Sequence, residues 1–477
     1  MKESILRKGS QATGFKLLFL ALTLLSFNGL TAANRSALTL IAYAVTAVGA
    51  AVLVIRVVCF KKYLHAKGLF LLIAFCGSYA LSALLTRQYG LSENAKALVW
   101  MAFQYFILYT YDTTSDGTAE KKEFYIISHF FMAYTFLAVA AGTVMLFADY
   151  YSYTEVNGVV VILGFLWNRL WGVYSDPNYG AVFSAITIIM SLYFYKDAKK
   201  PLKVLYIINI VLQICYIAFS DSRTGMVSLF CALLVYVYLT ALRSKKLEAK
   251  KAFVRGVICV LLAVTAAVAS FAAIKVVSVS TSEFKKWQYE HIISSDKDKT
   301  DAQKEKDKQT LEIGRQSNDI NGDVSNRRFA IWGSGLEIFK TKPLTGVTFR
   351  NYVPYAEDKL PDTYLVNNDF IEFHSMHNSF VDILVSQGIL GVVIIAAYII
   401  LVLVLIFKNF FKFKDEKYKY NTALLSIIAP IFASMMFYSE TFYMNTGGAF
   451  LFWLTLGYLV QSVTSKNSEA KEITPGK

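Results

Sequence analysis

The sequence predicts an all-α membrane protein of about twelve transmembrane helices, with one large extracytoplasmic loop before the tenth. Composition favours this class, because 55% of the 477 residues are hydrophobic and only 17% are charged, whereas soluble proteins carry about 25% charged residues. The order of residues favours it too, since apolar runs long enough to cross a bilayer alternate with short connections rich in lysine.

Apolar runs define the predicted spans, because a helix needs about 20 apolar residues to cross the hydrocarbon core. The first run follows Arg7 and Lys8, as in a signal peptide. It is long enough to span, however, and no clear cleavage site follows it, so we predict a permanent helix. The predicted spans are 15–33, 37–59, 68–86, 95–111, 124–148, 178–195, 202–220, 224–242, 253–276, 378–407, 421–438 and 446–464.

Basic residues set the predicted orientation. The formal net charge of +14 could suggest a nucleic-acid partner, but lysines clustered between apolar runs are typical of cytoplasmic loops, so we expect no nucleic acid. The clusters fall at both ends of the chain and at every second connection, which predicts that both termini are cytoplasmic. They lie at 2–8, 61–67, 121–122, 196–203, 243–255, 408–419 and 466–471.

These boundaries divide the chain into four predicted parts. Residues 1–277 hold the first nine spans, and 278–376 form the extracytoplasmic loop. Residues 377–464 hold spans ten to twelve, and 465–477 form a cytoplasmic tail. The protein is therefore expected in a bacterial cytoplasmic membrane with its large loop outside.

An outward-facing interfacial segment is predicted at 151–177. Within it, Val156–Trp171 is apolar but short, and counting it as a span would place the basic cluster at 243–251 outside. We therefore expect an interfacial or re-entrant helix, which is tolerated where protein covers its polar backbone. Trp167 and Trp171 suit the level of the lipid headgroups.

The large polar loop changes character along its length. Residues 296–308 are almost wholly charged, which predicts a solvated helix or a disordered tether. After Asn326, apolar side chains recur at three- and four-residue spacings and Pro343 follows as a stop signal, which predicts an amphipathic helix on the membrane or over the bundle. These side chains are Phe329, Trp332, Leu336 and Phe339.

Two sites at predicted helix ends could bind an anion. Arg169 and Asn178 flank the turn that opens the sixth span, although an Asp or Asn cap and an arginine reaching lipid headgroups would also explain them. Arg223 follows Ser222 in a short connection. Serine, arginine and the free N–H groups of a helix start together suit an anion, although Ser222 could simply cap and Arg223 could touch lipid phosphate.

Further candidates lie at both ends of the amphipathic stretch. Arg327 and Arg328 precede it, and guanidinium groups bind phosphate oxygens in pairs, although solvated surface pairs are common. His377, with Asn378, opens the tenth span and could accept a proton from a hydroxyl near neutral pH, although a lone histidine there is more often interfacial or a cap. A His374/His377 metal pair lacks a third ligand, so we expect no metal and no cofactor.

The predicted topology places these candidates on one side of the membrane. The motifs that contain them are RLWGVYSDPN, SRTG, RFAIW followed by KPLTGV, and HNSFVDILVSQGILG. In this order, over about residues 165–395, they resemble the O-antigen ligase and O-antigen polymerase superfamily. The HNSF…GILG segment and the SRTG turn are the most specific parts of the resemblance.

The resemblance implies an activity and roles for particular residues. Members of that superfamily transfer a glycan from undecaprenyl diphosphate to an acceptor hydroxyl at the outer face of the cytoplasmic membrane, as inverting, metal-independent enzymes. The implied diphosphate contacts are Arg223 and Arg328, and His377 would act as the base or orient the acceptor. We choose Arg328 over Arg327 because the family's arginine precedes its tryptophan by four residues.

Five other residues are expected substrate contacts on the same grounds. Arg169 and Asn178 match motif positions of the superfamily. Arg327, Asn378 and His374 adjoin the matched residues.

The first hypothesis for function is a polymerase that joins lipid-linked repeat units of capsule, exopolysaccharide or O-antigen. A ligase that passes the finished glycan to lipid A core or another surface acceptor is the alternative. A lipid-linked oligosaccharide flippase should show charges deep inside several spans, whereas these spans are nearly free of charge. Expected partners are the undecaprenyl-diphosphate-linked donor, a lipid-linked or surface glycan acceptor, membrane lipids, a flippase and a chain-length regulator.

The predicted orientation can be tested by labelling. Single cysteines at Ser280 and Lys359, in a cysteine-free background, should react with a membrane-impermeant thiol reagent in cells whose outer layer is permeabilised, because the lysine bias places both outside. A cysteine at Lys199 should be protected. Protection of both loop positions together with labelling at Lys199 would overturn the topology.

Overall fold

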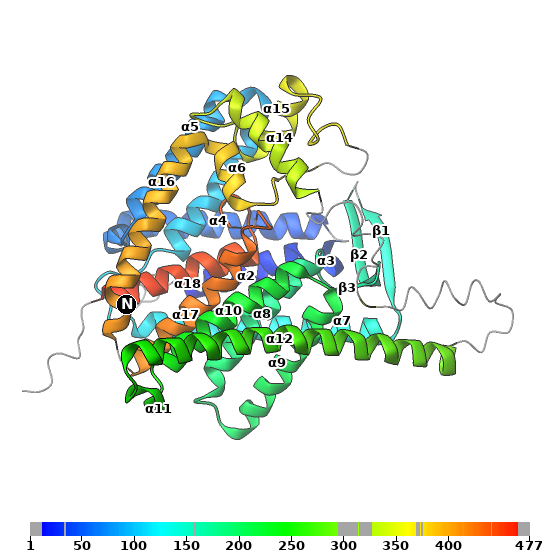
Figure 1. The fold of residues 1–477 in the computed structure, drawn as a ribbon. Helices are drawn as coiled ribbons and strands as arrows, with labels where there is room; N and C mark the ends of the chain where they lie inside the picture. The colour runs from blue at the N-terminus through cyan, green and yellow to red at the C-terminus, as the bar shows by residue number, and fades with distance from the viewer. Residues whose placement is uncertain are drawn as a thin grey trace, which may run out of the picture.

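The computed structural model is mostly helical and describes residues 12–32, 35–156, 159–293, 313, 327–368, 373, 375–413, 415–439 and 441–465 (Figure 1). The first half contains α2 Thr13–Ser26, α3 Gly29–Ala32, α4 Arg35–Cys59, α5 Leu69–Leu85, α6 Leu91–Phe103, α7 Thr118–Phe147, β1 Tyr151–Val156, β2 Val159–Leu166, β3 Arg169–Gly172, α8 Pro177–Tyr195 and α9 Lys200–Ser220. The second half contains α10 Arg223–Leu242, α11 Lys245–Glu248, α12 Ala252–Gln288, α14 Arg328–Thr341, α15 Tyr352–Lys359, α16 Ser379–Asn409, α17 Asp415–Ser434 and α18 Gly447–Thr464.

Each predicted span coincides with helix in the structure. Among the described residues, eight helices are long and apolar enough to cross a membrane. Two shorter apolar helices, α2 and α5, accompany them. The helical membrane-protein class is therefore confirmed, whereas the count of twelve crossings and their orientation stay predictions.

The first span is shorter than predicted, because α2 ends at Ser26 and a separate turn, α3, begins at Gly29. Asn28 interrupts the helix: its Oδ1 accepts from the Leu30 N–H (2.9 Å) and its Nδ2 donates to the Tyr134 hydroxyl (3.2 Å). An Asn side chain that bonds to nearby backbone favours a turn over a continued helix.

The segment Val156–Trp171 is not an interfacial or re-entrant helix, and that prediction was wrong. It forms most of a three-stranded antiparallel sheet in the order β1-β2-β3. The run of valine and isoleucine suits a strand, and short apolar runs do not distinguish strand from helix by periodicity. Trp167 (φ 53°) and Asn168 (φ 58°) form the two-residue turn between β2 and β3, in the left-handed conformation that a tight hairpin requires.

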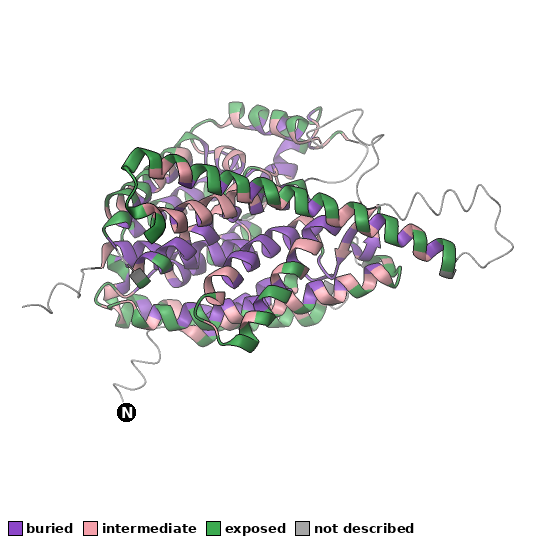
Figure 2. Cartoon of the chain, turned by 60° about the horizontal axis from the view of Figure 1, so that its bottom comes forward, coloured by how far each residue is buried: buried purple, intermediate pink, exposed green. Residues whose placement is uncertain are grey.

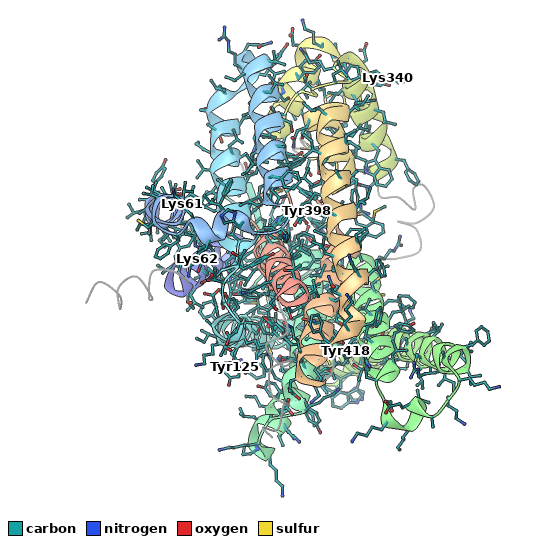
Figure 3. All side chains as sticks on the ribbon, turned by 90° about the vertical axis from the view of Figure 1, so that its left-hand side faces the viewer. Lys61, Lys62, Tyr125, Lys340, Tyr398 and Tyr418 are labelled. Carbon is teal, nitrogen blue, oxygen red and sulfur yellow. The ribbon has the colours of Figure 1, made fainter. Side chains whose placement is uncertain are left out.

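The helices form a central group and a periphery. Helix α18 is buried almost throughout, and α8 is buried over most of its length, whereas α4 and α12 expose most of their surface. Figure 2 shows α12 as a largely exposed helix along the front of the molecule. Lys61 and Lys62 lie in the turn after α4, and Lys340 projects from α14 at the top of Figure 3. Apolar surface on the peripheral helices is expected where lipid replaces water as the neighbour.

The ninth predicted span, 253–276, is followed by more helix than expected, because α12 continues to Gln288. The polar loop therefore begins later than predicted. A helix is present at the predicted place, α14, and it ends before Pro343. Its buried face is not the predicted one, because Phe329 and Leu336 are exposed while Ile331 and Ile338 are buried. The charged stretch at 296–308 lies outside the described residues. Helices α14 and α15 lie together beside the beginning of α16 (Figure 1).

Helix α16 is broken at Gly388, whose φ of 60° and ψ of −157° are not helical. The motif segment 343–348 pairs with the break: Val347 N–H donates to the Val385 carbonyl (2.9 Å) and Ile389 N–H donates to the Pro343 carbonyl (2.8 Å). The neighbouring Gln387 side chain donates to the Tyr443 hydroxyl (2.6 Å). The break therefore satisfies its backbone groups inside protein, as a broken helix in a membrane must.

Replacing Gly388 by Ala should destabilise the fold. Its backbone conformation is nearly restricted to glycine, which costs another residue about 1–3 kcal/mol, and an added Cβ would lie 2.5 Å from the backbone of Leu344. The thermal unfolding midpoint in detergent should fall. Gly77→Ala in α5 is the control, because nothing lies within 4 Å of its added Cβ. Equal midpoints for the two variants would contradict the role of the break.

Candidate active site

Three helix N-termini are capped by side chains and meet at one place. Asp176 caps α8 by accepting from the Asn178 N–H (2.7 Å), and Ser222 caps α10 by accepting from the Gly225 N–H (3.0 Å). Asn378 caps α16, with its Oδ1 accepting from the N–H groups of Phe380 (2.9 Å) and Val381 (3.2 Å). A capped helix start carries a partial positive charge, so the meeting point favours an anion.

Asn178 connects two of these helix starts to the sheet. Its Oδ1 accepts from the Ser222 hydroxyl (2.7 Å) and from the Arg169 guanidinium (3.1 Å). Arg169 also donates from Nε to the Ser220 carbonyl at the end of α9 (2.8 Å). Arg169 is thus held against protein groups rather than extended alone towards headgroups, and it ties β3 to the end of α9 and the start of α8.

Tyr438, in the connection after α17, joins the third helix start to the others. Its hydroxyl donates to the Asp176 carboxylate and accepts from Asn178 Nδ2 (3.1 Å). Its backbone carbonyl accepts from the Ser379 hydroxyl (2.8 Å) at the first residue of α16. One side chain and its own carbonyl therefore link α8 with α16.

The end of α2 holds the segment that leads to Asp176. Gly29 N–H donates to the Val173 carbonyl (2.7 Å), and Ser175 N–H donates to the Phe27 carbonyl (3.0 Å). These bonds occupy backbone groups freed where the first span ends early. The interruption at Asn28 therefore contributes to the position of the site.

Arg328 and Arg223 reach the same region from elements about a hundred residues apart. Burial lowers the pKa of Arg328, and the positive charge of Arg223 lowers it further, while Tyr438 and Asp176 raise it. The Arg328 guanidinium lies over the Phe437 ring (5.7 Å to the centroid). Its Nε is buried without a hydrogen-bond partner among the described residues. A buried cationic donor that lacks an acceptor favours an anionic ligand.

His377 lies directly before the cap of α16, with a φ of 48°. Its ring packs edge-on against those of Phe373 and Tyr438, each with centroids 6.1 Å away. Burial lowers the pKa of His377 below its ordinary value, and the charge of Arg328 lowers it further, while Asp176 opposes them. The imidazole is therefore neutral near pH 7 and able to accept a proton.

The loop that carries His377 is positioned from two sides. Trp332 of α14 donates from Nε1 to the Met376 carbonyl (2.9 Å). Met376 N–H donates to the carboxylate of Asp382 (2.9 Å), which lies on the first turns of α16. Both bonds fix the residue next to His377, so the RFAIW motif acts on the site through this loop.

The remaining predicted residues are placed as follows. Asn378 uses its Oδ1 in the cap and donates from Nδ2 to the Met436 carbonyl (3.3 Å). Arg327 stands at the N-cap position of α14 with a φ of 67°, and His374 lies outside the described residues. Among the residues that the structure describes, no three His, Cys, Asp or Glu side chains gather in a way that could hold a metal ion.

The structure brings Arg169, Asn178, Arg223, Arg328 and His377 together around a shared network. From sequence, residue 176 was predicted only as a cap, and no role was predicted for Tyr438. The only signal for Tyr438 was a hydroxyl at the end of the eleventh predicted span, on the same predicted side as the arginines. That signal is too common to single out one tyrosine.

Residues 208–396 match the family model described as O-antigen ligase. This match spans 189 of the 477 residues and supports a relation to the O-antigen ligase and polymerase superfamily. The match supports glycan transfer of the ligase or polymerase type, with lipid-linked glycan substrates, in a membrane protein. The matched residues include Arg223, Arg328 and His377, whereas Asp176 and Tyr438 lie outside them. A comparison with curated proteins finds no match.

The His377 imidazole should titrate below 6.5, its ordinary pKa. Asp176→Asn should lower the midpoint further, because the carboxylate stabilises the protonated ring, and Asn still caps a helix. Arg328→Gln should raise the midpoint by removing a nearby positive charge. Histidine-labelled protein followed by NMR against pH, with His377→Gln to identify the signal, gives the measurement. A midpoint of 6.5 or above in the unmodified protein would contradict the account.

Proposed function

We propose that the chain is a lipid-linked glycan polymerase. The donor is an oligosaccharide on undecaprenyl diphosphate, and the acceptor is a sugar hydroxyl of another lipid-linked repeat unit. Transfer takes place at the outer face of the cytoplasmic membrane and inverts the anomeric centre without a metal. The product is capsule, exopolysaccharide or O-antigen polysaccharide.

One observation carries this proposal: the buried Nε of Arg328 lacks an acceptor among the described residues, while the charge of Arg223 acts on the same guanidinium and His377 lies alongside. Two cations in mutual repulsion are stabilised by a ligand with two negative groups. A diphosphate offers several oxygens to two planar guanidinium groups, which can each bind two of them. The starts of α10 and α16 add the positive ends of their helix dipoles.

The bond changes follow from this placement. The acceptor oxygen forms a bond to the anomeric carbon while the bond from that carbon to the diphosphate oxygen breaks. The electron pair leaves with the diphosphate, whose growing charge Arg223 and Arg328 stabilise. Because the donor already carries a good leaving group, the step needs no nucleotide.

His377 receives the proton of the acceptor hydroxyl as the new bond forms. Its lowered pKa keeps the ring neutral, and the left-handed backbone holds it at the edge of α16. Asp176 stabilises the imidazolium that results, because its charge raises the pKa of His377. The proton then passes to water when the product leaves.

His377→Ala should leave the fold nearly unchanged, since the residue lies in a loop at a helix edge, while transfer falls by about 10²–10⁴-fold, the usual share of acid–base catalysis. The activity of the unmodified protein should rise with pH through a midpoint below 6.5, because only the neutral ring accepts a proton. Chain formation from purified lipid-linked repeat units is the measurement.

His374→Ala and His291→Ala are the matched controls for that experiment. The loss in His374→Ala should be far milder than in His377→Ala, because His374 lies outside the matched motif. His291 is exposed in the turn after α12, so His291→Ala should retain most activity. A well-folded His377→Ala protein that forms chains at a near-normal rate would remove the base from the mechanism. Transfer only to lipid A core or another surface acceptor, without a ladder of repeat units, would identify a ligase instead of a polymerase.

A further inference from the structure

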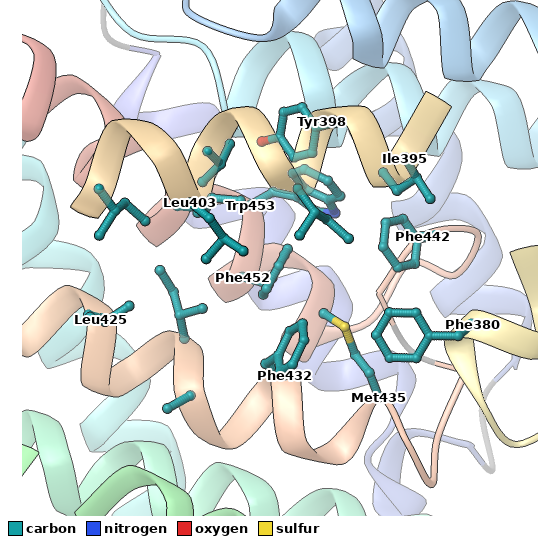
Figure 4. Close-up of a pocket in the computed structure, with 16 residues that line it drawn as sticks. Phe380, Ile395, Tyr398, Leu403, Leu425, Phe432, Met435, Phe442, Phe452 and Trp453 are labelled. Carbon is teal, nitrogen blue, oxygen red and sulfur yellow. The ribbon is translucent and has the colours of Figure 1, made fainter. Parts of the chain in front are cut away.

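An apolar groove runs between α16, α17 and α18. It encloses about 270 Å³ and is lined almost wholly by hydrocarbon and aromatic side chains. Figure 4 shows Phe380, Phe432 and Met435 at one end and Leu403 and Leu425 towards the other, all directed into the same space.

The lining offers almost nothing to a polar ligand. Trp453 donates its indole N–H to the Thr441 carbonyl (2.8 Å), so that group is already used. Apart from Trp453 and Tyr398, the side chains that line the groove carry no N–H or O–H group. The groove therefore suits a hydrocarbon chain rather than a sugar or a phosphate.

The groove is accessible from the outside of the bundle. Phe432 is 46% exposed and Leu403 is 45% exposed, one on each of the two helices that flank it. In a membrane these side chains contact lipid rather than water. A lipid chain could therefore enter sideways, without passing through the protein.

One end of the groove adjoins the candidate active site. Phe380 is the second residue of α16 and follows His377 by three positions, and its N–H is held by the Asn378 cap (2.9 Å). The Met435 carbonyl accepts from the Ser379 N–H (2.9 Å), which ties the end of α17 to the start of α16. Phe437, two residues further along, lies under the Arg328 guanidinium. A molecule with its head at Arg328 thus has a hydrocarbon path directly beside it.

We infer that this groove holds the polyprenyl tail of the donor, an inference that rests on the proposed function. The wall that α17 contributes between Leu425 and Met435 is about 15 Å long at 1.5 Å per residue, which is room for several isoprene units next to the diphosphate. The branched tail packs against the aromatic residues at the site end, and the rest continues into the bilayer. The groove thereby orients the diphosphate with respect to His377.

The test fills the groove at its one alanine. Ala429→Trp projects a large ring into the space, and Ala397→Trp is the matched control because Ala397 is exposed on α16 outside the lining. A glycan-free polyprenyl diphosphate with a photoreactive group on the isoprene units nearest the diphosphate is crosslinked to each protein in lipid nanodiscs, and the labelled peptides are mapped. Labelling should concentrate on α16 and α17 and fall at least about tenfold in Ala429→Trp only.

A transfer assay gives the second readout. Ala429→Trp should raise the KM for a full-length donor at least about tenfold and leave turnover of a donor with two isoprene units unchanged. Crosslinks elsewhere, while the unmodified protein still transfers glycan, would overturn the groove and leave the proposed function standing. Crosslinks in the groove without glycan transfer would support the groove as a lipid site and contradict the proposed function. A photoreactive alkyl phospholipid serves as a competing probe. If it labels the groove and polyprenyl diphosphate does not displace it, the groove is a site for bulk lipid and the inference is overturned.

Discussion

The hydroxyl of Tyr438 is the contact on which the site depends. It donates to Asp176 and accepts from Asn178, while the carbonyl of the same residue accepts from Ser379. Through Asn178 the network continues to Arg169 and Ser222. The starts of α8, α10 and α16 are thereby fixed relative to one another, as a ligand that must touch all of them at once requires.

The consequence of that arrangement is a concentration of positive charge. Two arginines and three helix starts face one region, and Asp176 is the carboxylate that acts on both Arg328 and His377. Such a region is less stable alone than with an anion, so part of the binding free energy of a diphosphate comes from relieving repulsion. Asp176 has two tasks here, because it caps α8 and also counters the effect of Arg328 on His377.

The sequence predicted the helices well because apolar length and lysine position follow directly from the bilayer, and it grouped Arg223, Arg328 and His377 through topology and motif resemblance. It failed at Val156–Trp171, where a valine-rich run suits strand and short helix alike and the outcome depends on pairing with β1. Tyr438 could not be found, because its role arises from a contact across 262 positions of sequence. The roles of the glycines in KPLTGV and SQGILG likewise depend on tertiary contact. At the break in α16, Gly346 packs against the backbone around Ser386, and Gly388 packs against the backbone of Leu344.

The central claim is that Arg223 and Arg328 bind one diphosphate together, and a double-mutant cycle tests it most directly. Equilibrium binding of undecaprenyl diphosphate is measured for the unmodified protein, Arg223→Lys, Arg328→Lys and the double variant, with folding checked for each. Each single change should weaken binding about tenfold or more, because lysine cannot grip two oxygens in a plane. The double change should cost clearly less than the sum of the two. Additive losses, or unchanged binding in either single variant, would contradict a shared clamp.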